Sequence, residues 1–258
     1  MGNLFTGLYG QVCGRELEAN LLNFQFLPAY YARRDIARDA SRISGRLLDL
    51  GCGNQPYRAF FPQNVEYIGL DFPTAQEGPY GQVHPAVYGD GRALPFADRS
   101  FDVVLCTQVL EHVDRPETVV QEIGRVMKPG GLGLISVPFF YNLHLEPHDF
   151  FRFSPYGIKD LLERHGLRVR QLRGQGGIGT LLVQMFHNWL FSGLARQARR
   201  SKPWGILLIP ALPLLLLLAA GNNLAALALD RVNNDDLRFA PNLWVVLEKN
   251  GFEPGKGT

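Results

Sequence analysis

The chain has few cysteines and little net charge, and both shortages exclude classes of protein. Its three cysteines, Cys13, Cys52 and Cys106, are an odd number without metal-ligand spacing. A disulfide scaffold is therefore excluded, and a reduced, cytosolic compartment is predicted. The formal net charge is only +2. The whole chain thus lacks the basic field of a nucleic-acid-binding protein, and we expect no nucleic-acid partner.

The sequence also lacks a secretory leader and an internal repeat. The N-terminus shows no succession of cationic, apolar and small residues, so secretion is not expected. No period of the kind that marks solenoids or propellers is present. The 258 residues are 46% hydrophobic and 19% charged, which is enough to bury one sizeable core. The composition predicts a globular cytoplasmic protein.

The first positive signal is a short apolar strand that ends in a glycine turn. Residues 46–50 read as a buried strand, and Gly51 and Gly53 form a tight turn at its carboxyl end. Glycine lets the backbone approach a ligand where a Cβ would collide with it. A second strand over 67–70 leads to Asp71, whose carboxylate can accept two hydrogen bonds from a ribose diol. The pattern predicts a nucleoside-binding half-fold.

Two cofactors fit this half-fold, and position 56 separates them. A dinucleotide fingerprint has a third glycine there, which packs a helix against the strand and seats a pyrophosphate. Pro56 stands in its place and disfavours a nicotinamide-dependent oxidoreductase, which is kept as an alternative. Asp49, inside the first strand, can face an ammonium or sulfonium group. At these residues the chain resembles the class I S-adenosylmethionine (SAM) dependent methyltransferases, whose first motif reads acidic-x-Gly-x-Gly.

Further segments follow in the order of that family. They are a third-strand motif over 89–96, a strand over 101–106, a helix that opens over 108–113, and a helix end and turn over 125–131 before a strand over 132–137. The match over residues 46–137 is similar to the small-molecule branch called type 11 methyltransferases. The resemblance implies an α/β fold with a doubly wound, seven-stranded, mostly parallel sheet and an antiparallel last strand. It also implies SAM as the cofactor.

The resemblance implies the cofactor contacts as well. Asp71 would hold the ribose, Asp90 the adenine amino group, and Gly51 with Gly53 the methionine end. Cys52 is expected to act through its backbone, since nothing near it indicates an activated thiolate. The predicted cofactor-binding residues are Asp49, Gly51, Cys52, Gly53, Asp71, Asp90, Gly91 and Thr107.

Acceptor chemistry is predicted in residues 139–154, which follow the fifth strand. Ligands bind at the carboxyl ends of the strands in folds of this type. His144, His148 and Asp149 can orient or deprotonate an acceptor hydroxyl, because the ordinary pKa of histidine lies near neutrality. The same three residues are a conceivable ligand set for a metal ion, but their spacing is unspecific and we predict no metal site.

The aromatic and basic residues of this loop leave two readings open. Tyr141 and Arg152 are predicted to bind the acceptor. In the alternative reading the loop is structural: Asp149 and Arg152 fasten it, and Ser154 caps a helix over 156–165. His112, next to Glu111 after the fourth strand, is expected to be structural.

The segments around the core set this chain apart. Residues 1–45 are predicted as an N-terminal helical cap that Pro28 bends, and a plain packing layer is the alternative. The core is predicted over 46–173 and 242–250, with strand six at 168–172 and strand seven at 243–248. Residues 174–241 form an apolar insertion between these two strands.

The insertion contains a long uncharged stretch. Residues 205–229 carry no charge and include a leucine run at 214–218, long enough for a membrane span. A single crossing would place strand seven on the wrong side of the bilayer. Because Pro210, Pro213 and the residues 221–223 interrupt the run, we expect two short helices or a re-entrant hairpin.

Basic and aromatic residues precede the leucine run. Arginine and lysine suit anionic headgroups, and tryptophan suits the membrane interface. We therefore predict peripheral contact with the inner face of the membrane through residues 196–229, and a small-molecule or lipid-like acceptor that receives the methyl group on oxygen. The alternatives are a hydrophobic cap or dimer contact, and a SAM-binding scaffold without catalysis. The residues concerned are Trp189, Arg196, Arg199, Arg200, Lys202 and Trp204.

Overall fold

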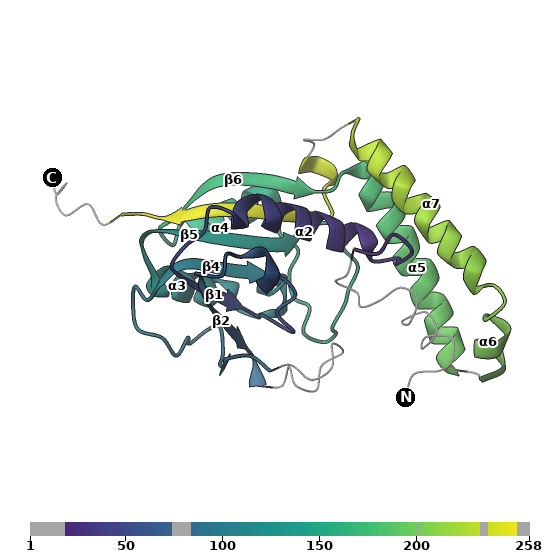
Figure 1. The fold of residues 1–258 in the computed structure, drawn as a ribbon, viewed down its shortest axis with the longest axis horizontal. Helices are drawn as coiled ribbons and strands as arrows, with labels where there is room; N and C mark the ends of the chain where they lie inside the picture. Colours follow the sequence, from purple (N-terminus) through teal and green to yellow (C-terminus); the bar gives the residue numbers. More distant parts are fainter. Residues whose placement is uncertain (1–18, 74–83, 201, 233–236, 252–258) are drawn as a thin grey trace. The chain divides into compact units, whose positions relative to one another are not determined.

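A computed structural model describes residues 19–73, 84–200, 202–232 and 237–251 (Figure 1). The chain divides into two compact units. Among the described residues, the sheet unit comprises those within 35–139, 143–173 and 243–251, and the helical unit those within 19–34, 140–142 and 174–242. The first part of the predicted N-terminal cap, residues 1–18, lies outside the described residues.

A seven-stranded sheet is the core of the sheet unit. Its order is β3-β2-β1-β4-β5-β7-β6. Strand β1 pairs in parallel with β2 and β4, and β4 pairs in parallel with β5. Figure 1 shows β7 running against its neighbours, so the predicted fold class is confirmed. The strands are β1 Arg46–Leu50, β2 Glu66–Asp71, β3 Val87–Tyr88, β4 Phe101–Thr107, β5 Met127–Pro138, β6 Leu167–Gln175 and β7 Asn242–Lys249.

Two helices of the sheet unit follow from their sequence patterns. Helix α3, Pro116–Val126, begins with proline and buries Val119, Val120 and Ile123 on one face. Helix α4, Pro155–Glu163, begins where predicted, because the Ser154 hydroxyl accepts a hydrogen bond from the Gly157 N–H at 3.1 Å. A short 3-10 helix, η1, spans Arg58–Phe60.

Two predicted helix boundaries differ from the structure. The helix expected from residue 108 is only a 3-10 turn, η3 Leu110–His112, because Gln108 has a φ of 54° that no α-helix accommodates. Helix α2, Phe26–Ala40, is not broken by Pro28. Proline lies there in the first turn, where its missing N–H has no partner to lose.

Strand β5 begins earlier than the predicted residue 132. The turn expected before it forms an irregularity within the strand. Phe101 pairs with Met127, whereas Val103 pairs with Leu132, so residues 128–131 loop out of the ladder. The side chain of Lys128 then reaches Asp102, with 2.7 Å between Nζ and Oδ1. The glycines at 130 and 131 permit this excursion, and Gly130 has a φ of 74°.

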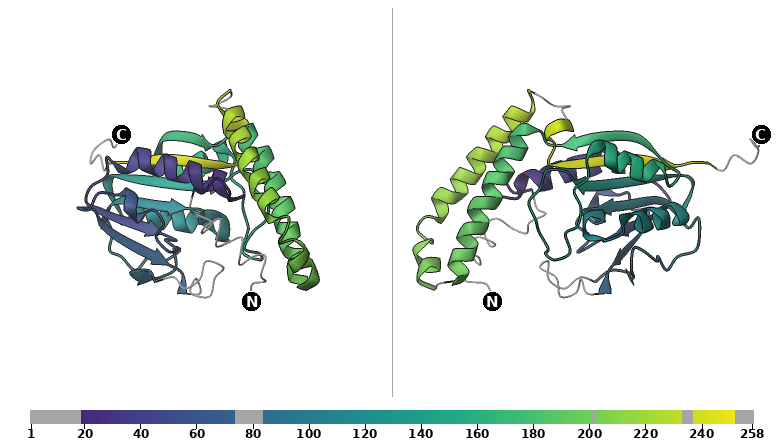
Figure 2. Two further views of the ribbon diagram at one scale, coloured as in Figure 1. Left: turned by 45° about the vertical axis from the view of Figure 1, so that its right-hand side comes forward. Right: turned by 180° about the vertical axis from the view of Figure 1, so that it is seen from behind.

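The helical unit is built on two long helices that lie side by side in both views (Figure 2). They are α5, Ile178–Arg200, and α7, Leu212–Asp230, joined by the short helix α6, Lys202–Leu207; the 3-10 helix η4, Leu237–Phe239, follows. Helix α7 continues through residues 221–223, so the predicted interruption there was wrong. The Asn223 side chain is held inside, where its Nδ2 donates to the carbonyls of Leu21 and Asn23 at 2.9 and 3.0 Å.

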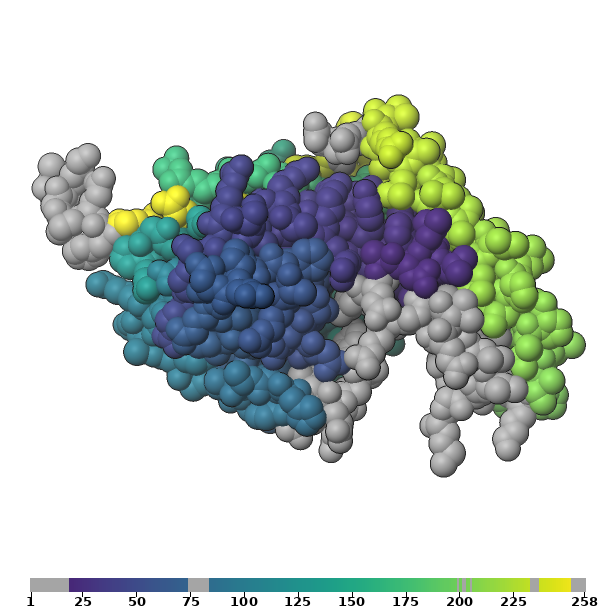
Figure 3. Space-filling model, in the orientation of Figure 1, coloured from purple at the N-terminus to yellow at the C-terminus, as the bar shows by residue number. Residues whose placement is uncertain are grey.

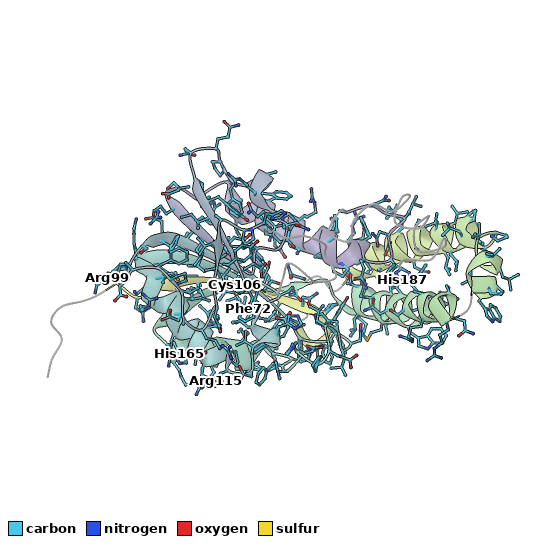
Figure 4. All side chains as sticks on the ribbon, turned by 90° about the horizontal axis from the view of Figure 1, so that it is seen from below. Phe72, Arg99, Cys106, Arg115, His165 and His187 are labelled. Atoms are coloured by element: carbon cyan, nitrogen blue, oxygen red, sulfur yellow. The ribbon has the colours of Figure 1, made fainter. Side chains whose placement is uncertain are left out.

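Polar side chains are buried inside the helical unit. Asp230 accepts hydrogen bonds from the Gly179 N–H at 2.8 Å, the Thr180 N–H at 3.1 Å and the Tyr31 hydroxyl at 2.8 Å. His187, labelled on α5 in Figure 4, is fully buried. Such a network fixes one arrangement of the helices, because each buried polar group requires its partner.

The outer face of α7 is apolar. Leu212 and Leu216 pack with Ala198 in a buried cluster, while Leu214 and Leu217 are 71% and 67% exposed. By length and composition α7 is sufficient to cross a membrane, and 28% of its most apolar stretch is buried within the protein. Figure 3 shows this helix, in yellow-green, as surface on the face in view.

Candidate functional site

The two glycines after β1 adopt the left-handed conformation that the turn requires. Gly51 has a φ of 72° and Gly53 a φ of 49°. A Cβ on Gly51 would lie 2.3 Å from Cγ2 of Val109, whereas a Cβ on Gly53 would meet no atom of the described residues within 4 Å. The first glycine is therefore required by packing, and the second leaves open space beside the backbone.

Asp71 fastens this loop to the end of β2. Its Oδ2 accepts a hydrogen bond from the Gly53 N–H at 2.7 Å, and its Oδ1 accepts one from the Phe72 N–H at 2.7 Å. An acceptor-only carboxylate retains further lone pairs after these two bonds. Asp71 thus orients the glycine loop and can still accept hydrogen bonds from a ligand diol.

The register of the sheet brings the predicted cofactor residues to one edge. Leu50 pairs with Leu70 of β2 and with Cys106 of β4, so Asp71 and Thr107 each lie one residue beyond that line. Thr107 in turn pairs with Ser136 of β5. Figure 4 labels Cys106 and Phe72, which mark the ends of β4 and β2. The chain order reverses direction beside β1, and ligands bind at such a switch point.

Asp49 is buried in the middle of this edge. It is 1% exposed, the Tyr67 hydroxyl donates to its Oδ2, and its Oδ1 has no hydrogen-bond partner among the described residues. Burial raises the pKa of Asp49 to about 7, against the effect of the Tyr67 hydrogen bond and aided by the charge of Asp71. A buried, unsatisfied carboxylate at a ligand site fits a positively charged group.

Asp90 has a partner that the sequence analysis missed. The guanidinium of Arg92 donates to it, with 2.8 Å between Nη2 and Oδ2, and also reaches Asp114 at 2.9 Å. The hydrogen bonds from Arg92 lower the pKa of Asp90, which is therefore ionised. Gly91 lies beside β1, where an added Cβ would be 3.4 Å from Cδ1 of Leu50. The Asp-x-Arg spacing was the available signal for this ion pair.

The two described cysteines are packing residues. Cys52 is buried against Gly69, where an added Cβ would lie 2.8 Å from the sulfur. Burial raises the pKa of the Cys52 thiol to about 12 and also raises that of Cys106. Neither sulfur is a nucleophile at neutral pH.

In the loop after β5, three of the predicted acceptor residues meet. Arg152 donates to both carboxylate oxygens of Asp149, at 2.6 Å from Nη1 and 2.7 Å from Nη2. The backbone N–H of His144 donates to the same carboxylate at 2.8 Å, and the His144 Nδ1 lies 3.3 Å from it. Although burial acts in the opposite direction, the hydrogen bonds from Arg152 and His144 lower the pKa of Asp149 to about 2.

Two further predicted residues have other partners. The His148 side chain is exposed, with its ring 6.3 Å from that of Phe150. Its backbone oxygen lies 2.6 Å from the His112 Nδ1, and its N–H donates to the Leu145 carbonyl at 3.0 Å. Tyr141 belongs to the helical unit, where its hydroxyl donates to Oε1 of Gln25 at 3.2 Å.

Glu111 is the residue that sequence reasoning missed. Its side chain is fully buried, and neither carboxylate oxygen has a hydrogen-bond partner among the described residues. Its Oε1 lies 3.8 Å from the His112 Nε2, and the rings of His112 and His144 meet edge to face at 4.7 Å. Burial raises the pKa of Glu111 to about 8 and lowers that of His112. The pair 111–112 was visible in the sequence, but its approach to His144 is a product of the fold.

Comparison with known proteins identifies methyltransferases as the relatives of this chain. The methyltransferase-domain family matches residues 48–135. An uncharacterized methyltransferase of Mycobacterium tuberculosis is 42% identical over 141 residues, which are 52% of each chain. A probable S-adenosylmethionine-dependent methyltransferase of Mycolicibacterium smegmatis is 31% identical over 191 residues, covering 68% of this chain and 74% of that protein.

The chain spans about half the length of the first curated relatives, 42% of one from Mycobacterium marinum and 52% of the M. tuberculosis protein. Among solved structures, the [4+2]-cyclase SpnF has the same fold, with a TM-score of 0.55 and 19% identity over 86% of this chain and 81% of the cyclase. At that identity the likeness concerns the fold alone.

Proposed function

We propose that this chain, which belongs to the SAM-dependent methyltransferases, transfers a methyl group from SAM to a hydroxyl of a small-molecule or lipid-like acceptor. The observation that carries the proposal is the carboxyl edge of β1 and β2. It combines an open glycine backbone, a ribose-competent carboxylate at Asp71 and the buried, unsatisfied Oδ1 of Asp49. These groups fit a cofactor that carries a diol and a positive charge.

The chain's own residues then have separate roles toward the cofactor. Asp71 accepts the hydrogen bonds of the ribose, and Asp49 faces the cationic methionine end beside Gly53. Bound SAM supplies a methyl group on a positively charged sulfur, so positioning of the acceptor is the main task left to the protein. We also retain Cys52, Asp90, Gly91 and Thr107 as proposed cofactor contacts, the first through its backbone.

His144 is the proposed catalytic residue for the acceptor hydroxyl. Asp149 faces its Nδ1 at 3.3 Å and is itself held by Arg152. A carboxylate with a pKa of about 2 is a poor proton acceptor but a good orienting group, so Asp149 is assigned to positioning. His148 is the second candidate base, because it is exposed beside the same loop. Tyr141 and Arg152 are proposed to bind the acceptor.

The lipid-like character of the acceptor rests on the helical unit. Helix α7 exposes Leu214, Leu217 and Leu224, and α5 exposes Trp189 at 70%. Large exposed apolar patches mark interaction sites. We propose that residues 196–229 rest on the inner face of the membrane, with Arg196 and Arg200 near anionic headgroups. In this proposal residues 46–173 with 242–250 form the catalytic core.

A second candidate is a protein that binds SAM without methyl transfer. SpnF, whose fold this chain shares, is described as a cyclase, so the fold by itself does not guarantee the reaction. The glycine loop would serve such a protein equally well. Only turnover separates the two candidates.

Incubation with methyl-labelled SAM tests the proposal. The protein is mixed with a lipid extract and with a water-soluble extract of the organism that encodes it, and label is followed into each fraction. We expect label in an organic-soluble product whose methyl group resists mild base, as an ether does and an ester does not. The His144→Gln variant should lose most of this transfer while keeping its SAM affinity. Labelled SAM that stays unchanged in every fraction would favour the non-catalytic candidate.

A further inference from the structure

Glu111, His112 and His144, here called the Glu-His-His cluster, form a second feature of the sheet unit. They come from η3 and from the loop after β5. One ligand atom from each lies within 4.8 Å of the others. Two imidazoles and one carboxylate are a donor set typical of zinc and other divalent transition metals, whereas magnesium and calcium prefer oxygen ligands alone.

The hydrogen bonds around the two histidines fix their tautomers. His112 Nδ1 lies 2.6 Å from the backbone oxygen of His148, and His144 Nδ1 lies 3.3 Å from Oδ2 of Asp149. Both partner oxygens only accept, so each Nδ1 carries the proton and each Nε2 carries the lone pair. Metal-binding histidines have this arrangement, with the second ring nitrogen bonded to a carbonyl or a carboxylate.

The third member of the cluster is a buried carboxyl group whose oxygens have no hydrogen-bond partner. Glu111 is fully buried, and neither of its oxygens has a hydrogen-bond partner among the described residues. Its one cationic neighbour in the loop, Arg152, is already bound through both Asp149 oxygens. A bound cation would supply the partner that both oxygens lack, because buried polar groups are normally hydrogen-bonded, paired or coordinated to metals.

We propose that the Glu-His-His cluster binds one divalent transition-metal ion of the zinc type. The ligand atoms are a carboxylate oxygen of Glu111 and the Nε2 atoms of His112 and His144. Ligands held at about 2.0–2.1 Å in a tetrahedral site lie roughly 3.3 Å apart, so ligand atoms that now lie within 4.8 Å of one another must approach by up to about 1.5 Å. Three protein ligands leave one coordination position for an acceptor oxygen or water.

The consequence for catalysis rests on the proposed function, whereas metal binding does not. A hydroxyl bound to such an ion would lose its proton to solvent water near neutral pH. In that state His144 holds the ion instead of accepting the proton, and Asp149 and the His148 carbonyl position the two ligands. On expansion of the site to five ligands, which catalytic zinc sites undergo, the cluster would favour acceptors whose hydroxyl stands next to a second oxygen that also reaches the ion.

Zinc binding to the whole protein tests the proposal without acceptor or turnover. Equilibrium dialysis against Zn²⁺, with Mg²⁺ in excess, should give one zinc per chain. Glu111→Gln and His144→Gln should each weaken binding at least tenfold, and Asp149→Asn by roughly 10–100-fold, the scale of losing a group that orients a ligand. His84→Gln is the matched control, because the exposed His84 has no part in the cluster, and its affinity should equal that of the wild type.

SAM affinity measured on the same samples reports whether each variant is folded. Should Glu111→Gln not fold, Co²⁺ bound to the wild type gives a separate answer. Its visible spectrum should show nitrogen and oxygen ligation without the charge-transfer band of a thiolate. Absence of zinc in the wild type, full stoichiometry in a His144→Gln/Glu111→Gln double variant, or a thiolate band would overturn the proposal. Methyl transfer with His144 as the base would survive any of these results.

Discussion

The sheet unit and the helical unit distribute polar and apolar groups in opposite ways. In the sheet unit, leucine, isoleucine and valine fill the interior, and the carboxylates Asp49, Asp71 and Asp90 collect at one edge. In the helical unit the interior contains amides, a histidine and Asp230, while leucines of α7 face outward. The first pattern is that of a protein that binds a polar cofactor. The second is that of a surface that meets something apolar.

The comparison with known proteins separates the two units in the same way. The methyltransferase-domain match over residues 48–135 lies wholly within the sheet unit. The long helices α5 and α7 lie outside that match. The difference teaches that the cofactor chemistry of the sheet unit is a family property, whereas the family-domain match does not reach α5 and α7.

The largest expected effect tests whether the glycine loop is fixed by packing. Gly51→Val should lower the free energy of unfolding by about 2–5 kcal/mol, because its Cβ would collide with Val109 and a branched residue resists positive φ. Gly53→Ala is the matched control. It has positive φ but open space, and should cost roughly 1 kcal/mol. Urea unfolding of both variants checks the difference, and equal losses would contradict the packing argument.

The next effect concerns the cofactor. Asp71→Ala should weaken SAM binding by about 1–3 kcal/mol, or roughly 5–150-fold, the scale of losing hydrogen bonds to a charged group. It also frees the Gly53 N–H, which loosens the loop. Asp160→Ala, which removes an exposed carboxylate on α4, should leave the affinity unchanged. Calorimetry with SAM measures both, and a folded Asp71→Ala protein of wild-type affinity would refute the ribose assignment.

A smaller effect is a pH dependence of SAM affinity. The pKa of Asp49 is raised from its ordinary value to about 7, so below neutrality the unliganded protein holds a proton there. That proton must leave before the carboxylate can pair with a cation. The affinity should therefore rise about tenfold per pH unit from pH 5 to 7 and level off above 7.

The Asp49→Asn variant is the control for this titration. It has no proton to lose, so its SAM affinity should be lower at pH 8 and nearly flat between pH 5 and 8. Calorimetry in buffers of different ionisation enthalpy would also detect the released proton directly. A wild-type affinity that does not change with pH would show that Asp49 does not face the charged end of the cofactor.

Much of the sheet unit could be predicted because its signals are local. A buried strand of five residues followed by Gly-x-Gly specifies its own turn, and Ser154 before Pro155 specifies a helix start. Predicted element boundaries were wrong where contacts between residues distant in sequence are made. Residues 128–131 loop out of the ladder between β4 and β5, and α7 passes through Gly221, where Asn223 donates to carbonyls of another segment.

The loop after β5 shows the same limit of prediction from sequence. Charge and spacing predicted that Asp149 and Arg152 would interact, since they are neighbours in sequence. Nothing in the sequence placed Glu111 beside His144, because the two are brought together only when the loop after β5 folds back on η3. There the Phe150 N–H donates to the Glu111 carbonyl at 2.8 Å. Long-range contacts of this kind need the fold itself.

Vesicle sedimentation with labelled SAM tests most directly whether the sheet unit binds the cofactor and the helical unit binds the membrane, because one experiment reports both activities. The wild type should carry labelled SAM into the pellet of anionic vesicles, and less of it into the pellet of neutral vesicles. Added salt should weaken the contribution of Arg196 and Arg200, because their attraction to headgroups is screened within about 8 Å at physiological ionic strength. A Leu214→Ser/Leu217→Ser variant should keep full SAM binding but remain in the supernatant. Asp71→Ala should sediment without label. The account would be contradicted by a wild type that ignores every vesicle composition, or by a serine variant that loses SAM as it leaves the membrane.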